Sequence, residues 1–228
     1  MTVPSEGNDA FDVAVKLFAG HSRCGDFCDV VHVGDDRTVV ITVDGGGHGV
    51  MGLAQANAMR VALRTALTVE DTMQDLATIM SALNRTFTAR RARQLVTCNV
   101  VMLDLSKGRA DYVNAGGPAP LLLPGQGHLI VLDQPSLVLG VDPHYEYECA
   151  SADLPAAFRL ISHTDGLTEM TNAAGEPFGE QRLHDLFLQA EAFGTPPEII
   201  VRIVEAHEKH AGGRSSDDDA LVVVVGHG

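Results

Sequence analysis

One stretch of sequence decides how this chain folds, because it holds no polar residue over six positions: Ala220-Leu221-Val222-Val223-Val224-Val225. Residues branched at the β-carbon favour extended backbone, so the stretch is predicted to be a strand. A half-buried strand alternates apolar and polar residues, whereas a strand covered on both faces does not. Residues 220–225 are therefore expected inside a sheet that has another layer on each side.

The rest of the sequence supplies strands and helices in a regular order. Strands are predicted at residues 12–18, 27–33 and 38–43, and the last two would form a hairpin across the turn at 34–36. Helices are predicted at 50–67 and 72–91, where Ala, Leu, Met and Arg are frequent. Further strands follow at 95–105, 109–113, 120–123, 128–132, 145–152 and 158–162, and then helices at 181–190 and 197–211. Thr195 and the prolines after it suit the start of the last helix.

This order of elements predicts an α+β fold. Strands, helices, strands, helices and a final strand indicate two antiparallel sheets packed together with helices outside each, which is a four-layer α-β-β-α sandwich. A chain of 228 residues with 45% hydrophobic content can bury a full core as one domain. We expect a short N-terminal extension at residues 1–10 and a single domain at 11–228.

The charge balance limits the classes of partner. The formal net charge is -14, from 30 acidic and 16 basic residues, which disfavours nucleic acid and anionic membrane surfaces because both bind basic patches. An acidic surface also repels phosphate unless cations are bound to it. No signal peptide or stretch of about 20 apolar residues is present. Four scattered cysteines fit a reducing compartment, so a cytoplasmic location is expected.

Aspartates occupy a shared local setting at four places in the sequence. Each lies at the end of a predicted strand, beside glycine or another aspartate: Asp26, Asp44, Asp165 and the run Asp217 to Asp219. Carboxylates at strand ends can converge although they are distant in sequence, and hard cations such as Mg²⁺ and Mn²⁺ take oxygen ligands. Any single Asp-Gly pair is more simply interpreted as a turn. The four positions together favour a metal centre.

The sequence around these aspartates resembles the SpoIIE type of PPM phosphatases, the bacterial branch of the type 2C Ser/Thr phosphatases. Residues 24–29 are similar to that family's Gly-Gly-Asp-aromatic-aromatic-Asp, and residues 44–49 to its Asp-x-Ser-Gly-His-Gly. Residues 112–120 resemble Tyr-Val-Asn-Ala-Gly-His-Pro-x-Pro, residues 163–169 resemble Tyr-Thr-Asp-Gly-x-Thr-Glu, and residues 217–221 resemble Asp-Asp-x-Thr/Ala-Leu. The order and spacing match from about residue 11 to residue 225.

The resemblance implies a protein-serine/threonine phosphatase that uses two Mn²⁺ or Mg²⁺ ions to activate a water molecule. It implies that Asp44 bridges the two ions, that the carbonyl of Gly45 completes one shell, and that Asp26, Asp165 and Asp217 supply the other catalytic carboxylates. Asp218 is the alternative to Asp217, because three aspartates run together there. The implied substrate is a phosphorylated STAS-domain regulator, such as an anti-sigma-factor antagonist or a stressosome component.

Four residues depart from the family pattern. Gly117 replaces the histidine of the family motif, and Gly46 replaces its serine. Cys24 replaces a glycine and Cys28 replaces an aromatic residue. Neither Gly117 nor Gly46 is an expected ligand, but these two glycines leave a second hypothesis open, in which a degenerate phosphatase binds a phosphoprotein without hydrolysing it. The cysteines could bind zinc or take part in redox chemistry, although small buried apolar residues are the simpler interpretation.

Two further groups of residues are interpreted as surface features. His207 and His210 lie on a predicted helix with glutamates, and a solvated face is the simpler interpretation than a metal site. Arg90, Arg91 and Arg93 form a basic cluster that could meet an acidic partner, although a solvated helix end is the simpler account.

Overall fold

A computed structural model describes residues 10–18, 25–45, 49–68, 75–89, 95–125, 127–189, 194–214 and 218–228. One of its two sheets, the β2 sheet, is an antiparallel meander. Its strands in spatial order are β2 (Asp26–His32), β3 (Arg37–Asp44), β4 (Thr97–Asp104), β5 (Arg109–Ala115) and β8 (Ala150–Asp153). The pairing of β2 with β3 confirms the predicted hairpin, and it places Asp26 directly opposite Asp44.

The other sheet, the β10 sheet, joins the first and last strands of the described chain. Its strands in spatial order are β1 (Asp12–Phe18), β10 (Ala220–His227), β9 (Phe158–His163), β6 (Leu121–Pro124) and β7 (Ile130–Val131). All neighbours in this sheet are antiparallel. Since β10 lies between β1 and β9, the interior position predicted for residues 220–225 is confirmed.

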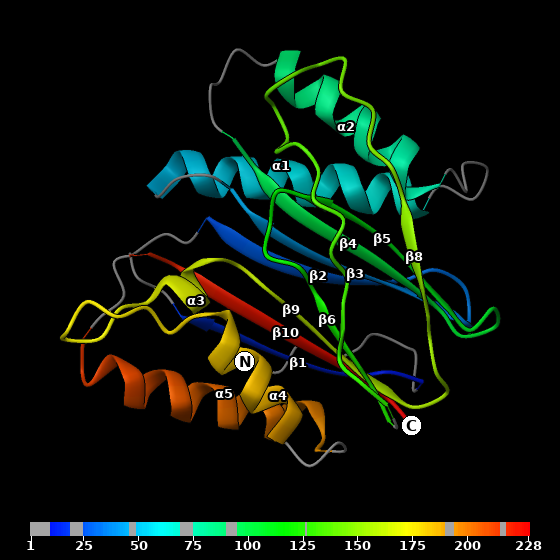
Figure 1. Ribbon diagram of the computed structural model, residues 1–228. Coiled ribbons are helices and arrows are strands. Elements are labelled where there is room, and N and C mark those ends of the chain that lie inside the picture. The colour runs from blue at the N-terminus through cyan, green and yellow to red at the C-terminus, as the bar shows by residue number, and fades with distance from the viewer. Residues whose placement is uncertain are drawn as a thin grey trace.

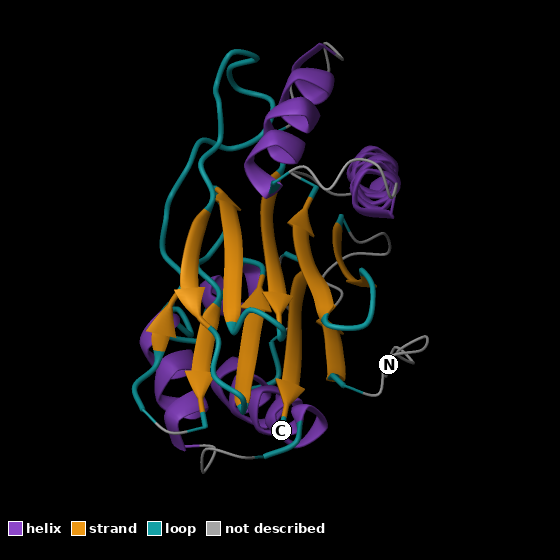
Figure 2. Cartoon of the chain, turned by 90° about the vertical axis from the view of Figure 1, so that its right-hand side faces the viewer, coloured by secondary structure: helices purple, strands orange, loops and turns teal. Residues whose placement is uncertain are grey.

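Helices cover the outer face of each sheet, so the molecule has four layers (Figure 1). Over the β2 sheet lie α1 (Gly49–Thr68) and α2 (Leu76–Ala89), and over the β10 sheet lie α4 (Glu180–Gln189) and α5 (Pro196–Ala211). Figure 2 shows the two stacked sheets between these helices. The predicted four-layer α+β sandwich is thus confirmed. None of the helices in the described ranges is both long and apolar enough to cross a membrane.

Three apolar cores explain why the last strand has no polar residue. Val223 and Val225 of β10 point between the two sheets, where they pack with Phe158 and Leu160 of β9. The alternating residues Val222 and Val224 point the other way, into the core beneath α4 and α5. A third core lies between the β2 sheet and the helices α1 and α2. Both faces of β10 are therefore buried, as the sequence pattern requires.

Two predicted strands are mostly wrong, and one of them, predicted at 128–132, shortens to β7 at Ile130–Val131. Residues 145–152 were expected to be extended and paired, but only Ala150–Asp153 forms β8. Tertiary contacts hold the segment before β8: the backbone N–H of Tyr147 donates to Ser81 Oγ on α2, and the Tyr147 hydroxyl donates to the Leu137 carbonyl. Tyr147 thus anchors a connecting segment to α2 and to the backbone at Leu137, where a sequence pattern alone indicates a strand.

The surface interpretation of His207 is also wrong. This residue is buried on α5 in the same stripe as Ile199, Ile203 and Ala211. Its ring lies 4.7 Å from the ring of Phe18 and 5.5 Å from that of Phe178. Burial lowers the pKa of His207, so the imidazole is a neutral core side chain. The cluster Arg90, Arg91 and Arg93 lies outside the described residues.

Candidate metal centre

The end of the β2–β3 hairpin carries two of the predicted carboxylates. Asp26 begins β2 and Asp44 ends β3, and the two residues are partners in the antiparallel register. Residue parity places both side chains on the face toward the β10 sheet, because Cys28 and Val40 on the same faces pack in the core between the sheets. Directly opposed residues in such a pair have close side chains. Strand pairing therefore brings the two carboxylates together.

The β10 sheet contributes polar groups to the same place. Thr164, which follows β9, donates its hydroxyl to Asp26 Oδ2 at 2.7 Å. Asp219, which precedes β10, accepts the backbone N–H of Gly25 at Oδ2 over 3.2 Å. Both Thr164 and Asp219 are buried. Asp26 and Asp44 of one sheet and Asp219 beside the other thus form an acidic cluster, although Asp219 is distant from the other two in sequence.

The pKa of Asp26 is shifted by its burial and by the neighbouring carboxylates. Burial raises the pKa of Asp26 to about 8, the Thr164 hydrogen bond opposes the rise, and the nearby carboxylates Asp44, Asp219 and Asp218 add to it. Like charges at short range disfavour ionisation, so Asp26 stays protonated unless a cation offsets its neighbours. Carboxylate oxygens are the ligands that Mg²⁺ and Mn²⁺ prefer. The chemistry of this donor set fits a hard divalent cation.

Two glycines beside the aspartates are required by close packing. A methyl group on Gly166 would overlap the carbonyl oxygen of Asp219, and one on Gly45 would lie 2.9 Å from the Gly52 carbonyl oxygen and 3.0 Å from that of Gly25. The N–H of Gly45 also donates to the Gly25 carbonyl at 3.2 Å. These glycines allow neighbouring backbone to approach the cluster, which no residue with a Cβ would permit.

Asp165 is placed by a short helix that the sequence analysis did not anticipate. It is the N-cap residue of α3 (Gly166–Glu169), and its backbone carbonyl accepts from Thr168 and Glu169 at 2.9 Å each. Its side chain makes no capping hydrogen bond, although N-cap carboxylates often do. Asp165 itself lies in a turn that opens into α3, so the turn interpretation of the Asp165-Gly166 pair fits the local structure.

The predicted ligand set is only partly covered by the structure. Asp26, Asp44, Gly45, Asp165 and Asp218 are described, whereas Asp217 and the loop residues Gly46 and His48 lie outside the described residues. Over the ranges that are described, no three acidic, histidine or cysteine side chains are grouped closely enough to hold one ion together. The described carboxylates by themselves do not form a three-residue set for one ion, and the choice between Asp217 and Asp218 stays open.

Asp219 is the buried acid that the sequence analysis did not assign a role. It aligns with the variable position of the family motif, so the resemblance gave it no function. Strand parity could have found it, because Asp219 shares the inward face of Leu221, Val223 and Val225. An aspartate at the start of that face must lie between the sheets beside Asp26.

The departure at Gly117 has a local structural explanation. A methyl group on Gly117 would lie 2.8 Å from Nδ2 of Asn99. The same Nδ2 donates to the Pro118 carbonyl at 2.7 Å, so the amide of Asn99 fills the space beside residue 117. A histidine at position 117 would require Asn99 to move. The position of the Asn99 side chain therefore depends on glycine at position 117.

Cys28 behaves as the apolar interpretation expects. It packs at the margin of the core between the sheets, and burial raises its pKa to about 12. The thiol is therefore protonated at neutral pH, which disfavours zinc or redox chemistry. Cys24 lies outside the described residues.

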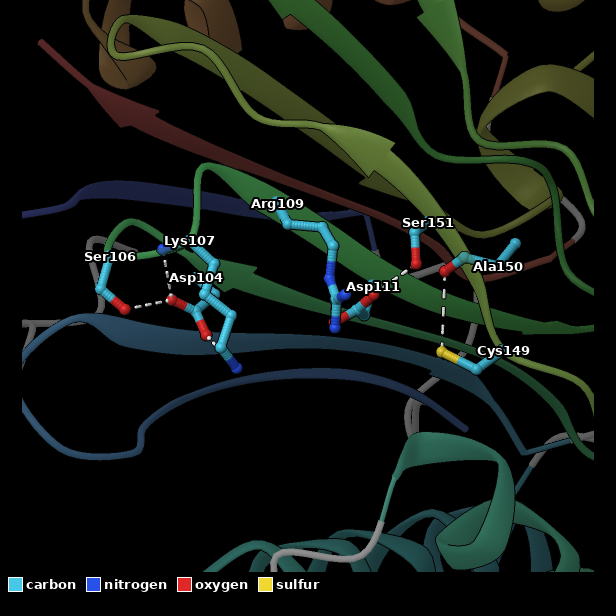
Figure 3. A network of polar contacts seen from close by, with 8 residues as sticks. All are labelled: Asp104, Ser106, Lys107, Arg109, Asp111, Cys149, Ala150 and Ser151. Carbon is cyan, nitrogen blue, oxygen red and sulfur yellow. Dashed lines mark hydrogen bonds and ion pairs between the residues drawn. The ribbon is translucent and has the colours of Figure 1, made fainter.

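A separate cavity of about 340 Å³ lies at the opposite end of the β2 sheet, beneath α2. Its lining includes Arg109, Asp111 and Ser151, which form a polar network on β5 and β8 (Figure 3). Arg109 donates twice to Asp111 Oδ2, at 3.0 and 2.8 Å, and Ser151 donates to Oδ1 at 2.5 Å. Asp26 and Asp44 do not line this cavity, so its volume gives no support to the metal centre.

The architecture is that of the PPM, or type 2C, phosphatase fold. The SiaA PP2C domain of Pseudomonas aeruginosa superimposes with a TM-score of 0.81 at 19% identity, over 93% of this chain and 83% of that chain. RsbX, solved in complex with magnesium, superimposes with a TM-score of 0.68 at 18% identity, over 98% of both chains. At these identities, the two structures establish the fold alone.

The model of the Stage II sporulation protein E (SpoIIE) family matches residues 34–227, so this chain belongs to that family. The phosphoserine phosphatase RsbP of Bacillus subtilis is 25% identical over 227 residues, covering 96% of this chain and 53% of RsbP. The chain spans about half or less of the length of the curated relatives it matches. The activity of those longer proteins is thus a starting point for a proposal about this one.

Proposed function

We propose that this chain is a metal-dependent phosphatase that removes phosphate from serine or threonine of a regulatory protein. The observation that carries the proposal is the convergence of Asp26, Asp44 and Asp219 from two sheets at one end of a type 2C phosphatase fold. The name of RsbP, a phosphoserine phosphatase, supports the reaction class. The rival hypothesis is a degenerate phosphatase that binds a phosphoprotein without hydrolysing it.

The residues that would hold two Mn²⁺ or Mg²⁺ ions are the predicted ones: Asp26, Asp44, the Gly45 carbonyl, Asp165, and Asp217 or Asp218. The magnesium bound in RsbX supports this choice of cation. When bound, two such ions lower the pKa of a water molecule and neutralise charge on the phosphoryl oxygens. The protein's own part is to hold the carboxylates on two rigid sheets, so that little rearrangement is needed when substrate arrives.

The cysteines in the described part of the chain favour water as the nucleophile. Burial raises the pKa of Cys28 to about 12, that of Cys149 to about 11, and that of Cys98 as well. A thiol attacks phosphorus as a thiolate, and these thiols are protonated at neutral pH. A cysteinyl-phosphate intermediate is therefore disfavoured.

A phosphorylated STAS-domain regulator is the substrate that we propose, in keeping with the family resemblance. The net charge of -14 speaks against nucleic acid as a partner and against an anionic membrane surface. A cytoplasmic location would bring the enzyme together with such a regulator.

The test compares the wild-type chain with Asp44→Asn and Asp104→Asn. Asp104 is a matched control, because it is a buried aspartate at the far end of β4, where Ser106 and Lys107 hold its carboxylate (Figure 3). The assays are Mn²⁺-dependent hydrolysis of p-nitrophenyl phosphate and of a phosphorylated STAS-domain protein. Asp44→Asn should abolish turnover of both substrates, whereas Asp104→Asn should retain it.

Two results would overturn the proposal. One is full activity of Asp44→Asn. The other is a wild-type chain that binds the phosphoprotein but hydrolyses neither substrate at any Mn²⁺ concentration, which would establish the degenerate phosphatase instead.

A further inference from the structure

The hydroxyl of Thr164 connects the two sheets at the acidic cluster. It donates to Asp26 Oδ2 at 2.7 Å and accepts the backbone N–H of Leu221 at 2.9 Å. Thr164 follows β9, Leu221 lies in β10 and Asp26 begins β2, so one side chain links three strand ends. We propose that Thr164 is a positioning residue that orients Asp26 for cation binding. The inference rests on the proposed function and adds a residue outside the predicted ligand set.

The direction of the two hydrogen bonds is fixed by their chemistry. A hydroxyl has one proton to donate and two lone pairs to accept with. Because the Leu221 N–H is a donor, it must use a lone pair of Oγ1, and the ionised carboxylate of Asp26, which is the form that would bind a cation, can only accept the hydroxyl proton. The bond thus holds one chosen oxygen of Asp26, which sets the plane of the carboxylate.

Thr164 itself has little freedom to move. Its backbone N–H donates to the Leu221 carbonyl at 3.0 Å, and its side chain is buried. A residue branched at the β-carbon is also stiff about its first side-chain torsion. The hydroxyl therefore presents its proton from a rigid frame, as a group that orients a metal ligand must do.

A purely structural hydroxyl bridge nearby provides the comparison. Thr42 of β3 donates to Ser162 Oγ of β9 at 2.8 Å, and both residues are buried. Thr42 lies two residues before Asp44, and Ser162 lies two residues before Thr164. The Thr42 bridge joins the same two sheets, but the acceptor that it reaches is a hydroxyl and not a carboxylate.

The experiment measures Mn²⁺ affinity by calorimetry and thermal unfolding without metal, on the full chain. Loss of a group that orients a metal ligand typically costs about 10- to 100-fold in metal affinity. Thr164→Val should weaken Mn²⁺ binding by about that factor. Thr164→Ser, which keeps the hydroxyl, should bind Mn²⁺ nearly as the wild type does. Thr42→Val should lower the melting temperature and leave Mn²⁺ affinity unchanged.

Phosphatase activity against Mn²⁺ concentration gives a second readout. Thr164→Val should need more Mn²⁺ for half-maximal activity, and saturating Mn²⁺ should restore most of its turnover. A Thr164→Ala variant replaces Thr164→Val in both assays if the valine disturbs folding.

The outcomes separate this inference from the proposed function. Thr164→Val and Thr42→Val with equal losses of stability and unchanged Mn²⁺ affinity would reduce Thr164 to a structural bridge, while the phosphatase proposal would stand. Thr164→Ser that binds Mn²⁺ as weakly as Thr164→Val would also refute orientation by the hydroxyl. A wild-type chain that binds no Mn²⁺ and hydrolyses no phosphoester would remove the proposed function and this inference together.

Discussion

Replacing Gly166 by alanine tests how tightly the start of β10 is packed against α3. The added methyl group would overlap the Asp219 carbonyl oxygen, and it would lie 3.0 Å from the carbonyl carbon and 3.3 Å from Cβ of Ala220. Carbon atoms prefer separations of about 3.5 to 4.0 Å, so backbone must move. Overpacking of this kind costs about 3 kcal/mol. At about 2 to 4 °C for each kcal/mol in a chain of this size, the melting temperature should fall by about 6 to 12 °C.

Gly175→Ala is the matched control for this substitution. Gly175 has a φ of 80° and nothing within 4 Å of an added Cβ, so only left-handed strain of about 1 kcal/mol is expected there. Thermal unfolding in a chelator measures both variants, and Mn²⁺ calorimetry should show weaker binding for Gly166→Ala alone, because displacement of the β10 start moves Asp218. If the two variants had the same melting temperature and the same Mn²⁺ affinity, the close approach of Gly166 to Asp219 would be wrong.

Three further predictions concern separate parts of the molecule. In the metal-free protein the raised pKa of Asp26 means that a cation must displace a proton below pH about 8; calorimetry should therefore show Mn²⁺ affinity rising with pH and levelling off above that value. Burial lowers the pKa of His207 in the folded protein, so below pH 6.5 the unfolded chain binds more protons than the folded chain does. The free energy of unfolding should therefore be constant above pH 6.5 and fall as the pH is lowered from there through the pKa of folded His207. Urea titrations at several pH values should show that His207→Leu removes this pH dependence. Asn84→Ala leaves the Asp142 carbonyl and the Gly140 N–H without the partner that they contact at 2.7 and 2.9 Å; urea denaturation should show a loss of about 3 kcal/mol, with Mn²⁺ affinity intact.

Strands with strong local patterns were predictable from sequence. The predicted boundaries of residues 12–18 coincide with β1, and those of residues 27–33 and 38–43 fall within one residue of β2 and β3. Burial on both faces leaves an unbroken apolar run, as in β10, and this signal survives any detail of packing. The position of Asp44 opposite Asp26 also follows from a hairpin whose register is fixed.

Contacts between distant segments account for what the sequence did not reveal. The segment before β8 has an alternating pattern, but Ser81 takes the Tyr147 N–H that a strand would have used. His207 has glutamates beside it in sequence, yet Phe18 from β1 covers its ring. The role of Asp219 depends on Gly25, which lies 194 residues away. Local periodicity carries no information about such partners.

The position of β10 between β1 and β9 has a consequence for biosynthesis. Until residues 220–227 have left the ribosome, the two strands that flank them have no neighbour in common, and the β10 sheet cannot close. Asp26 is made 193 residues before Asp219, so the two side chains meet only once residue 219 has left the ribosome. A nascent chain therefore cannot bring the acidic residues of the two sheets together before the β10 strand has been made.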